Sequence, residues 1–384
     1  MAVFDSCRPY DVAIVGSGPA GSIAALYLSS HGAKVALLEK KSLPRYKTCG
    51  GGIIQRAIRF MPVDVAELFE RECYSVELNL RSVHLCFSVK RKEPIISLAM
   101  RDKLDFFLVS AAKKAGAKIH SQCRVSDIIS RNDQVELITE KGSVYARFVV
   151  AADGAVSTVA RKAGWQETRR LVPAVECEVF VPEEVQKKFI HAARFDFGLI
   201  HSGYTWLFPK KDHISIGAMC VERVPIEWNS LLDKYFKLIG LDKVRHIKKH
   251  ASVIPISPRK DTFVKGRILL TGDAAGFADP ITGEGISLAL RSGLMAGKVL
   301  IDFNFEESSV KYVYESELER QILRELRLGR ILSKIVFNYP KMRDNLFRLF
   351  GQKLTEAMTD VIMGKKTYGE LLHNPMNYLR LFRP

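Results

Sequence analysis

The chain has 384 residues, of which 47% are hydrophobic and 26% charged, as in ordinary globular proteins. This length exceeds one simple core and predicts two interleaved domains, or one large α/β domain with an inserted one. The formal net charge of +16 favours anionic partners such as phosphates, acidic lipid surfaces or acidic redox proteins, although a well-solvated basic surface gives the same count. No nucleic-acid motif or zinc-ligand spacing stands out, so we expect no nucleic-acid partner and no metal.

Cysteine spacing and hydropathy bear on the compartment. The seven cysteines include no CxxC pair, which is typical of a reducing cytosol. Asp5 stands where an export signal needs an apolar run, and no apolar stretch reaches the roughly eighteen residues that span a bilayer. We therefore expect a cytoplasmic protein in which any membrane contact is peripheral.

Three glycines follow the first predicted strand. The strand is the apolar run Val12–Val15, as expected for a strand buried on both faces of a parallel sheet. Gly16 permits a tight turn, Gly18 lets the backbone approach a pyrophosphate, and Gly21 lets the next helix pack closely on the strand. The N-terminal amides of that helix would then face the phosphates.

A second predicted strand, Val35–Leu38, ends at Glu39, whose carboxylate can accept hydrogen bonds from a ribose diol. A GxGxxG motif by itself is often only a glycine-rich turn. Here strand, glycines, helix, strand and acid occur in order within about thirty residues, and this order predicts a dinucleotide site.

The next elements change in character along the chain. Leu98–Ala117 predicts a helix, and Lys118–Glu140 and Ser143–Ala151 predict strands of a meander, with a turn at Lys141–Gly142. In Leu171–Ile254, β-branched and aromatic runs alternate with charged turns. This region predicts a second, mostly antiparallel domain with a face able to cover a ligand.

The last third returns to the first pattern and then becomes helical. Ile268–Thr271 predicts a buried strand and Ile286–Leu300 a helix, so the first domain is discontinuous. Residues from Ser309 to Pro384 predict helices, and packing on the core is favoured over lying on a membrane. Their apolar stripe consists of Leu318, Ile322, Leu326, Ile331, Ile335 and Val336.

Two further segments repeat the pattern of a strand followed by a turn and a helix N-terminus. In VVAADGAVSTVAR, a strand ends in Asp153 and Gly154, and a helix begins near Ser157. In RILLTGDAAGFADPITGEGISLAL, a strand ends in Gly272 and Asp273, whose carboxylate can bind a ribityl or ribose hydroxyl. Each dipeptide alone would be an ordinary turn, but their joint occurrence predicts convergence on one long cofactor.

The third segment also precedes a helix. The amides of Gly285 and Ile286 would lie at its N-terminus, where they can stabilise negative charge on a reduced isoalloxazine ring.

The segments GSGPAG, AADG and TGDAAGFADPITGEGI resemble the flavoprotein fold of p-hydroxybenzoate hydroxylase and its relatives, up to about residue 300. Two more resemble the geranylgeranyl reductase branch of that group. RYKTCGGG at Arg45–Gly52 is similar to a basic-x-Cys-Gly stretch beside the flavin, and YTWLFP at Tyr204–Pro209 to the PxxYxWxFP motif of the prenyl-binding cavity. His201 stands where that motif has its first proline, which leaves cavity shape and chain-length preference open.

The resemblance implies an α/β (α+β) fold with a Rossmann-like, discontinuous FAD-binding domain. The implied divisions are 1–75, 95–170 and 255–305 for that domain, 76–94 and 171–254 for an inserted, mostly antiparallel β substrate domain, and 306–384 for a helical C-terminal region.

The resemblance also implies FAD as cofactor, reduced by NAD(P)H or a reduced electron-transfer protein, because no second GxGxxG unit exists for a nicotinamide domain. Arg101 can pair with pyrophosphate, although a solvated arginine at a helix start is equally consistent. The predicted cofactor residues are Gly16, Gly18, Ala20, Gly21, Glu39, Lys40, Cys49, Gly50, Gly52, Arg101, Val125, Asp153, Gly272, Asp273, Gly285 and Ile286.

Cys49 is the candidate catalytic residue. A buried, inert cysteine is the commoner fate of this residue type. Its glycine-rich loop, with Arg45 and Lys47 nearby, could instead make the thiol accessible and acidic, so that it donates a proton.

Tyr204, Trp206 and Phe208 alternate on a strand and therefore face one way. They could form a sheet face in the core or an aromatic wall for an apolar chain, and the resemblance favours the wall. With Pro209 they are the predicted substrate residues.

The implied function is reduction of carbon–carbon double bonds in isoprenoid, geranylgeranyl-type chains of lipids or prenyl diphosphates, with hydride from N5 of the reduced flavin. Three alternatives stay open. A flavin monooxygenase would hydroxylate an aromatic or quinone-like substrate and consume oxygen. A halogenase is suggested by a faint likeness of YTWLFP to WxWxIP. A flavin or lipid carrier would bind FAD without productive redox cycling.

Overall fold

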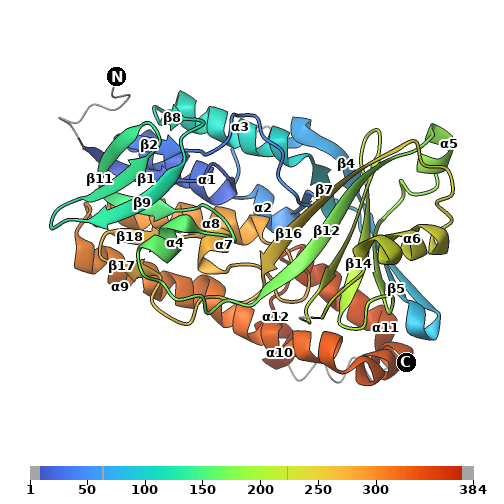
Figure 1. The fold of residues 1–384 in the computed structure, drawn as a ribbon. Helices are drawn as coiled ribbons and strands as arrows, with labels where there is room; N and C mark the ends of the chain where they lie inside the picture. The colour runs from blue at the N-terminus through green and yellow to red at the C-terminus, as the bar shows by residue number, and fades with distance from the viewer. Residues whose placement is uncertain (1–8, 63–64, 223, 374–384) are drawn as a thin grey trace.

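The computed structural model describes residues 9–62, 65–222 and 224–373, and it confirms the predicted mixed α/β fold class (Figure 1). A helix-covered sheet in blue and green lies at one end of the molecule, and a green and yellow sheet lies at the other. Asp5, which argued against an export signal, and residues 374–384, the end of the predicted helical tail, lie outside the described residues.

The first sheet has a parallel centre. β1 pairs in parallel with β2 and β11, and the strand order is β17-β18-β11-β1-β2-β8, with β10 and β9 added as the predicted meander. Its central strands are buried on both faces, which explains their uninterrupted apolar sequence. The strands are β1 Tyr10–Val15, β2 Val35–Leu38, β8 Lys118–His120, β9 Val125–Ser130, β10 Val135–Thr139, β11 Gly142–Ala151, β17 Val264–Lys265 and β18 Ile268–Leu270.

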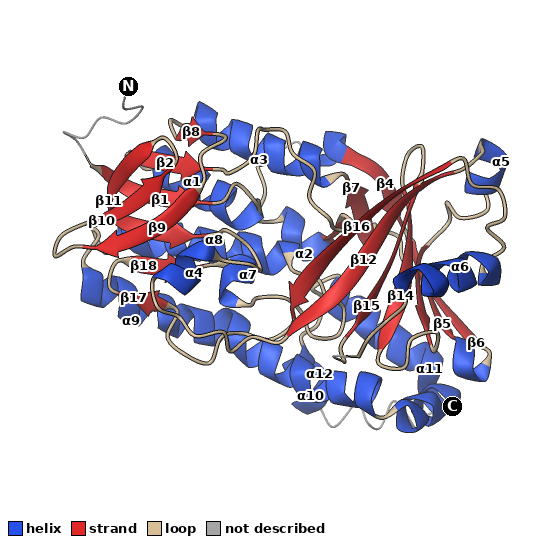
Figure 2. Cartoon of the chain, viewed as in Figure 1, coloured by secondary structure: helices blue, strands red, loops and turns tan. Residues whose placement is uncertain are grey.

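Helices pack on this sheet, and α1 contacts both α8 and α3 (Figure 2). A Cβ added at Gly293 of α8 would lie 2.1 Å from Ala20 O, so the two helix backbones touch. The helices of this part are α1 Pro19–Ser30, α2 Gln55–Ile58, α3 Arg101–Lys114, α4 Thr158–Lys162, α7 Gly272–Ala275 and α8 Ile286–Asp302.

The second sheet is antiparallel except where β13 pairs in parallel with β5, and its order is β16-β12-β15-β14-β13-β5-β6. Helix α6 covers one face with an apolar cluster, and the other face turns toward the first sheet. The boundaries between domains stay a prediction. The elements are β5 Ser75–Leu80, β6 Leu85–Lys90, β12 Leu171–Phe180, α5 Glu183–Gln186, β13 Ala193–Phe197, β14 Gly203–Pro209, β15 Ile214–Cys220, α6 Trp228–Leu238 and β16 His246–Pro255.

A small third sheet corrects one expectation. Leu98 does not begin a helix, because residues 96–99 pair as β7 with β3 and β4, and α3 starts only at Arg101. The elements here are β3 Gly52–Ile54, β4 Phe69–Cys73 and β7 Ile96–Ala99, with 3-10 turns η1 Val65–Leu68 and η2 Arg81–Val83.

The C-terminal helices run along one side of both sheets (Figure 1). Leu318, Ile322 and Leu326 are buried as expected, but Ile331 is 57% exposed, so that part of the predicted stripe is wrong. Leu326 follows a π-helical turn and stays buried. Ile331 lies five residues after Leu326 in the regular helix α10, which at 3.6 residues per turn places it off the buried face, whereas Phe337 lies on that face. The elements are α9 Glu307–Leu318, η3 Glu319–Leu323 (the π-turn), α10 Arg324–Asn338, α11 Pro340–Ile362 and α12 Tyr368–His373.

Candidate functional site

A cavity of about 420 Å³ lies between the two sheets. Its lining includes Val15, Leu38, Ala152 and Thr271, which stand at or just beyond the carboxyl ends of four first-sheet strands, where α/β folds bind ligands. Most predicted residues line it, namely Gly16, Gly18, Ala20, Glu39, Lys40, Cys49, Gly50, Gly52, Arg101, Val125, Asp153, Asp273, Gly285 and Ile286 from the cofactor set and Tyr204, Trp206 and Phe208 from the substrate set.

Three predicted residues lie outside the lining. Gly21 packs α1 on the strand, since an added Cβ would lie 1.9 Å from Gly16 O. Gly272 donates its backbone N–H to Ser292 Oγ at 3.0 Å and has a φ of +51°. Pro209 is the buried last residue of β14, beyond the end of the aromatic wall.

The glycine turn leaves room for a phosphate at only one of its glycines. Gly16 has a φ of +102°, and an added Cβ would lie 2.3 Å from Ala152 O. At Gly18, which caps α1, the nearest atom to an added Cβ is Arg101 Nη2 at 4.0 Å. This open cradle at the start of a twelve-residue helix fits a dinucleotide pyrophosphate.

Arg101 faces this cradle from the start of α3. Asp105 holds its guanidinium through two hydrogen bonds, from Nε at 2.9 Å and from Nη2 at 3.0 Å. Burial lowers the pKa of Arg101, but the charges of Asp105 and Cys49 outweigh this and raise it, so the guanidinium stays charged. The fixed cation matches the predicted pyrophosphate role better than a solvated helix-start arginine does.

Glu39 lies buried at the end of β2. Its Oε2 accepts hydrogen bonds from Ser17 Oγ at 2.6 Å and from Arg45 Nε at 3.0 Å, and its Oε1 accepts from Lys41 N at 3.0 Å. Burial works to raise the pKa of Glu39, yet Arg45 and these hydrogen bonds lower it overall. An ionised acceptor is therefore held at the position expected for a ribose contact.

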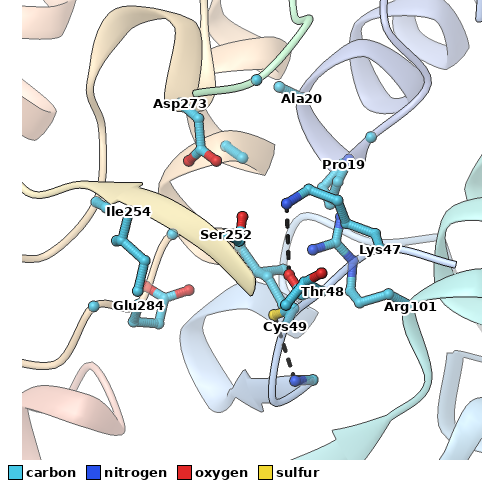
Figure 3. Close-up of a pocket in the computed structure, with 18 of the residues that line it drawn as sticks. Pro19, Ala20, Lys47, Thr48, Cys49, Arg101, Ser252, Ile254, Asp273 and Glu284 are labelled. Carbon is cyan, nitrogen blue, oxygen red and sulfur yellow. Dashed lines mark hydrogen bonds between the residues drawn. The ribbon is translucent and has the colours of Figure 1, made fainter. Parts of the chain in front are cut away.

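The two other predicted acids have different surroundings. Asp153 Oδ1 accepts from Ser157 Oγ at 2.6 Å and Oδ2 accepts from Val159 N at 3.0 Å. Both oxygens of this carboxylate therefore already bind groups at the start of α4. Asp273 extends into the cavity across from Arg101 (Figure 3).

The aromatic wall stands on the second sheet. Trp206 lies flat over Gly217, where an added Cβ would meet its ring at 2.0 Å. Across the cavity wall, a Cβ at Gly50 would lie 2.9 Å from Phe208 and 3.0 Å from Trp206 Nε1. That indole nitrogen is buried and has no hydrogen-bond partner within the described residues, so it can donate to a bound molecule.

Cys49 lies in the cavity between Arg101 and Lys47 on one side and Ser252 and Ile254 on the other (Figure 3). Its Sγ accepts a hydrogen bond from Gly51 N at 3.4 Å. Cys49 is half-buried and lines the same cavity as Arg101. The thiol is thus in contact with the cavity rather than inert in the core.

Sequence reasoning missed a buried acid pair, Glu176 and Glu178, on β12. Glu176 lines the cavity, and its Oε2 accepts from Cys49 N at 2.6 Å. Glu178 stands on the same face of the strand, because residues two apart share a face. Burial and then the charge of Glu178 raise the pKa of Glu176. The signal was present: two acids stand at alternate positions in the otherwise apolar run AVECEVFV.

The C-terminal helices also reach the cavity, which the sequence did not indicate. Val361, Ile362 and Tyr368 line it, and Tyr368 Oη donates to Asp279 Oδ2 at 2.9 Å across 89 positions of sequence. In contrast, His201, the departure from the proline motif, is exposed and does not line the cavity.

No helix within residues 9–62, 65–222 and 224–373 is long and apolar enough to cross a membrane.

Comparisons with known proteins agree with this geometry. The family model of the FAD binding domain matches residues 9–320. The digeranylgeranylglycerophospholipid reductase 2 of Methanothermobacter thermautotrophicus is 31% identical, over 76% of this chain and 77% of its own. The chloroplastic geranylgeranyl diphosphate reductase of rice (Oryza sativa subsp. japonica) is 28% identical, over 98% and 85%.

Solved structures show the same fold. A geranylgeranyl bacteriochlorophyll reductase-like protein from Thermoplasma acidophilum has a TM-score of 0.79 at 23% identity, covering 97% of this chain and 96% of that one. A flavin-dependent brominase has a TM-score of 0.71 at 19% identity, covering 93% and 94%. The fold alone therefore does not separate reduction from halogenation.

Proposed function

We propose that this chain, which belongs to the geranylgeranyl reductase family of FAD-dependent oxidoreductases, reduces carbon–carbon double bonds in isoprenoid chains of lipids or prenyl diphosphates. One observation carries the proposal. A single cavity joins an open pyrophosphate cradle at Gly18 to an aromatic wall at Trp206 and Phe208, with Cys49 between them. If the pyrophosphate of FAD lies in the cradle and an apolar chain lies on the wall, the flavin ring and the chain would meet at that cysteine.

Each part of the cavity has its own task in this proposal. Gly18 and Arg101 bind the pyrophosphate, and Glu39 receives the ribose. Bound FAD, once reduced, supplies a hydride from N5. The wall orients the chain and excludes water, and the Cys49 thiol protonates the second alkene carbon. Because an unactivated alkene offers no charge to stabilise, positioning and a placed proton donor carry most of the catalysis.

A bound prenyl chain would find further space beyond the aromatic wall. A second cavity of about 90 Å³ lies between the second sheet and α11, and it shares Phe195, Tyr204, Thr282 and Ile362 with the first. A geranylgeranyl chain longer than the first cavity could extend into it.

The proposal is tested by anaerobic incubation of the FAD-loaded protein with dithionite and geranylgeranyl diphosphate, followed by mass spectrometry. We expect a gain of two hydrogens per reduced double bond in the wild type and a loss on the order of 100-fold in Cys49→Ala with FAD retained. The exposed Cys86→Ala is the matched control and should keep full activity. Rapid substrate-triggered oxygen consumption with NAD(P)H would instead establish a monooxygenase.

The electron donor is proposed to be NAD(P)H or a reduced electron-transfer protein that docks transiently, because the described fold has one dinucleotide turn and the chain one GxGxxG. Anaerobic bleaching of the flavin absorbance by NADPH, compared with bleaching by a reduced ferredoxin, identifies the class.

The lipid would be taken from an anionic membrane that this protein contacts peripherally. The support is three exposed apolar residues along α10, α11 and the junction between them, with Ile331 at 57%, Tyr339 at 59% and Leu349 at 72% exposure, and a net charge of +16. Leu349→Glu should weaken co-sedimentation with phosphatidylglycerol vesicles. Neither the variant nor the wild type should bind phosphatidylcholine vesicles. Tyr312→Glu on α9, with 77% exposure, is the control and should bind like the wild type.

A further inference from the structure

Reduction of an alkene consumes a proton that the cavity must recover after every cycle. Per double bond, the π bond breaks and two C–H bonds form, one from a hydride that carries the electron pair and one from a proton. The electrons come from the donor named above, dithionite in the laboratory. A thiol that gives its proton beside a bound flavin and a bound prenyl chain, which both displace water, needs a defined route for a new proton, and the network behind Cys49 supplies a candidate.

A line of hydrogen-bonding groups leads from the surface to the Cys49 loop. Asp212, whose side chain is 73% exposed, places Oδ1 2.7 Å from His213 Nδ1. On the other side of the ring, His213 Nε2 lies 2.7 Å from Glu178 Oε2. Tyr46 Oη then lies 3.5 Å from Glu178 Oε1 and 3.3 Å from Glu176 Oε2. We propose that this line, Asp212–His213–Glu178–Tyr46–Glu176, returns protons from solvent to the Cys49 loop, an inference that rests on the proposed function.

The chemistry of each member suits proton transfer. Both ring nitrogens of His213 face carboxylate oxygens, so the ring can accept a proton on one side and release one on the other. A tyrosine hydroxyl is both donor and acceptor and can bridge two carboxylates. The line ends at Glu176, whose Oε2 accepts a hydrogen bond from the backbone N of Cys49 at 2.6 Å.

The charges around the line keep a proton in it. Lys210 is buried at the end of β14 and donates to Gly50 O at 2.8 Å and to Ala99 O at 3.2 Å. It interacts with both Glu176 and Glu178, but one cation offsets only one of two buried carboxylates. The second acid is therefore favoured in its protonated form, as the raised pKa of Glu176 indicates.

Other groups around the line have defined places. Ser215 Oγ donates to Glu176 Oε1 at 2.8 Å, and His250 of β16 stacks on Tyr46 at 4.1 Å between ring centroids. Phe180 covers His213 at 4.9 Å, and Lys248 lies over the Phe180 ring at 5.5 Å. The charge of Lys103 from α3 acts on Asp212. Burial lowers the pKa of His213, but its bonds to Glu178 and Asp212 raise it overall.

The test is repeated turnover of the FAD-loaded protein with excess dithionite and geranylgeranyl diphosphate, measured as the steady-state rate of product formation from about pH 6 to about pH 9. Glu178→Gln and His213→Gly should each slow this steady-state rate by about 10- to 100-fold, with the loss growing as pH rises and free protons become scarce. FAD affinity and reduction by dithionite should not change. Added imidazole should restore the rate of His213→Gly, which a purely structural role would not allow.

Two matched variants serve as controls. Glu136→Gln removes a buried carboxylate of the first-sheet meander, and His250→Gln removes the ring that stacks on Tyr46 outside the line. Both should turn over like the wild type. Wild-type rates in Glu178→Gln and His213→Gly at every pH, or a pH-independent loss without imidazole rescue, would overturn the proposal.

A second readout does not depend on turnover. NMR titration of labelled histidines in the FAD-loaded protein should show the His213 pKa falling in Glu178→Gln, since that acid raises it. If the wild type reduces no prenyl diphosphate, the proposed function fails, and the line is judged by this titration alone. An unchanged His213 titration in Glu178→Gln contradicts it.

Discussion

The two walls of the cavity are built by different means. On the first-sheet side, the pyrophosphate cradle is backbone, and its key position, Gly18, works because it lacks a side chain. On the second-sheet side, the wall consists of side chains, with Trp206 and Phe208 supplying apolar area and Glu176 supplying an acid. The comparison teaches that adding atoms should damage the first wall and removing them should damage the second.

The largest effect is expected at the cradle. Gly18→Val should weaken FAD binding by on the order of 100-fold, which corresponds to about 2.8 kcal/mol, because the side chain occupies pyrophosphate space. Thermal unfolding of the FAD-free variant should match the wild type, since the site is open in the folded chain. Gly21→Val is the matched control. There the added atoms meet Gly16 O, so the fold itself should be destabilised. Unchanged flavin absorbance in purified Gly18→Val would contradict the cradle.

The wall should fail in the opposite way. Trp206→Ala should weaken binding of geranylgeranyl diphosphate by about tenfold, as measured by calorimetry, while FAD affinity stays unchanged. It should also lower the free energy of unfolding by about 3 kcal/mol, because a buried indole is lost. Trp165→Ala, in the first-sheet core, controls for stability and should leave prenyl affinity intact. Equal affinity in Trp206→Ala and wild type would remove Trp206 from the substrate site.

A smaller effect is expected on the pH dependence of stability, which should differ between Glu176 of the wall and Glu136, a carboxylate outside the cavity lining. The pKa of Glu176 is raised from 4.5, so the folded protein keeps a proton that the unfolded chain releases, and stability falls as pH rises above that value. Glu176→Gln removes this penalty. The difference in melting temperature between variant and wild type should therefore be more favourable to the variant at pH 8 than at pH 5, by about 2–4 °C. At Glu136, hydrogen bonding to Arg131 lowers the pKa, so Glu136→Gln should give the opposite sign. Calorimetric scans at the two pH values decide.

The smallest effect is expected where the tail closes the cavity. Tyr368→Phe removes the hydrogen bond to Asp279 and should lower the free energy of unfolding by about 1 kcal/mol. FAD affinity should not change, because the contact lies on neither the cradle nor the wall. A loss of FAD in this variant would mean that the tail helps to hold the cofactor.

The backbone-built wall was the more predictable one. Its signals are local: Gly16 and Gly18 sit between one strand and one helix, and Asp273 and Gly285 repeat the pattern. Their convergence follows from parallel strands that end at one edge, and the structure brings them into one cavity.

The side-chain wall was predictable only in part. Alternation placed Tyr204, Trp206 and Phe208 on one face, but the approach of Glu176 to Cys49 depends on how two distant segments pack. No local pattern carries that information. The contact of Tyr368 with Asp279 could not be predicted for the same reason. The exposure of Ile331 could have been predicted, because five residues separate it from Leu326 and a helix repeats every 3.6.

The central claim is that one cavity holds a flavin against an isoprenoid chain that it reduces. Mass spectrometry of lipid co-purified with the FAD-loaded protein, before and after anaerobic dithionite, tests it most directly. We predict a prenyl lipid that gains two hydrogens for each double bond consumed. Co-purified prenyl lipid whose mass is unchanged after full reduction of the bound flavin would contradict the account.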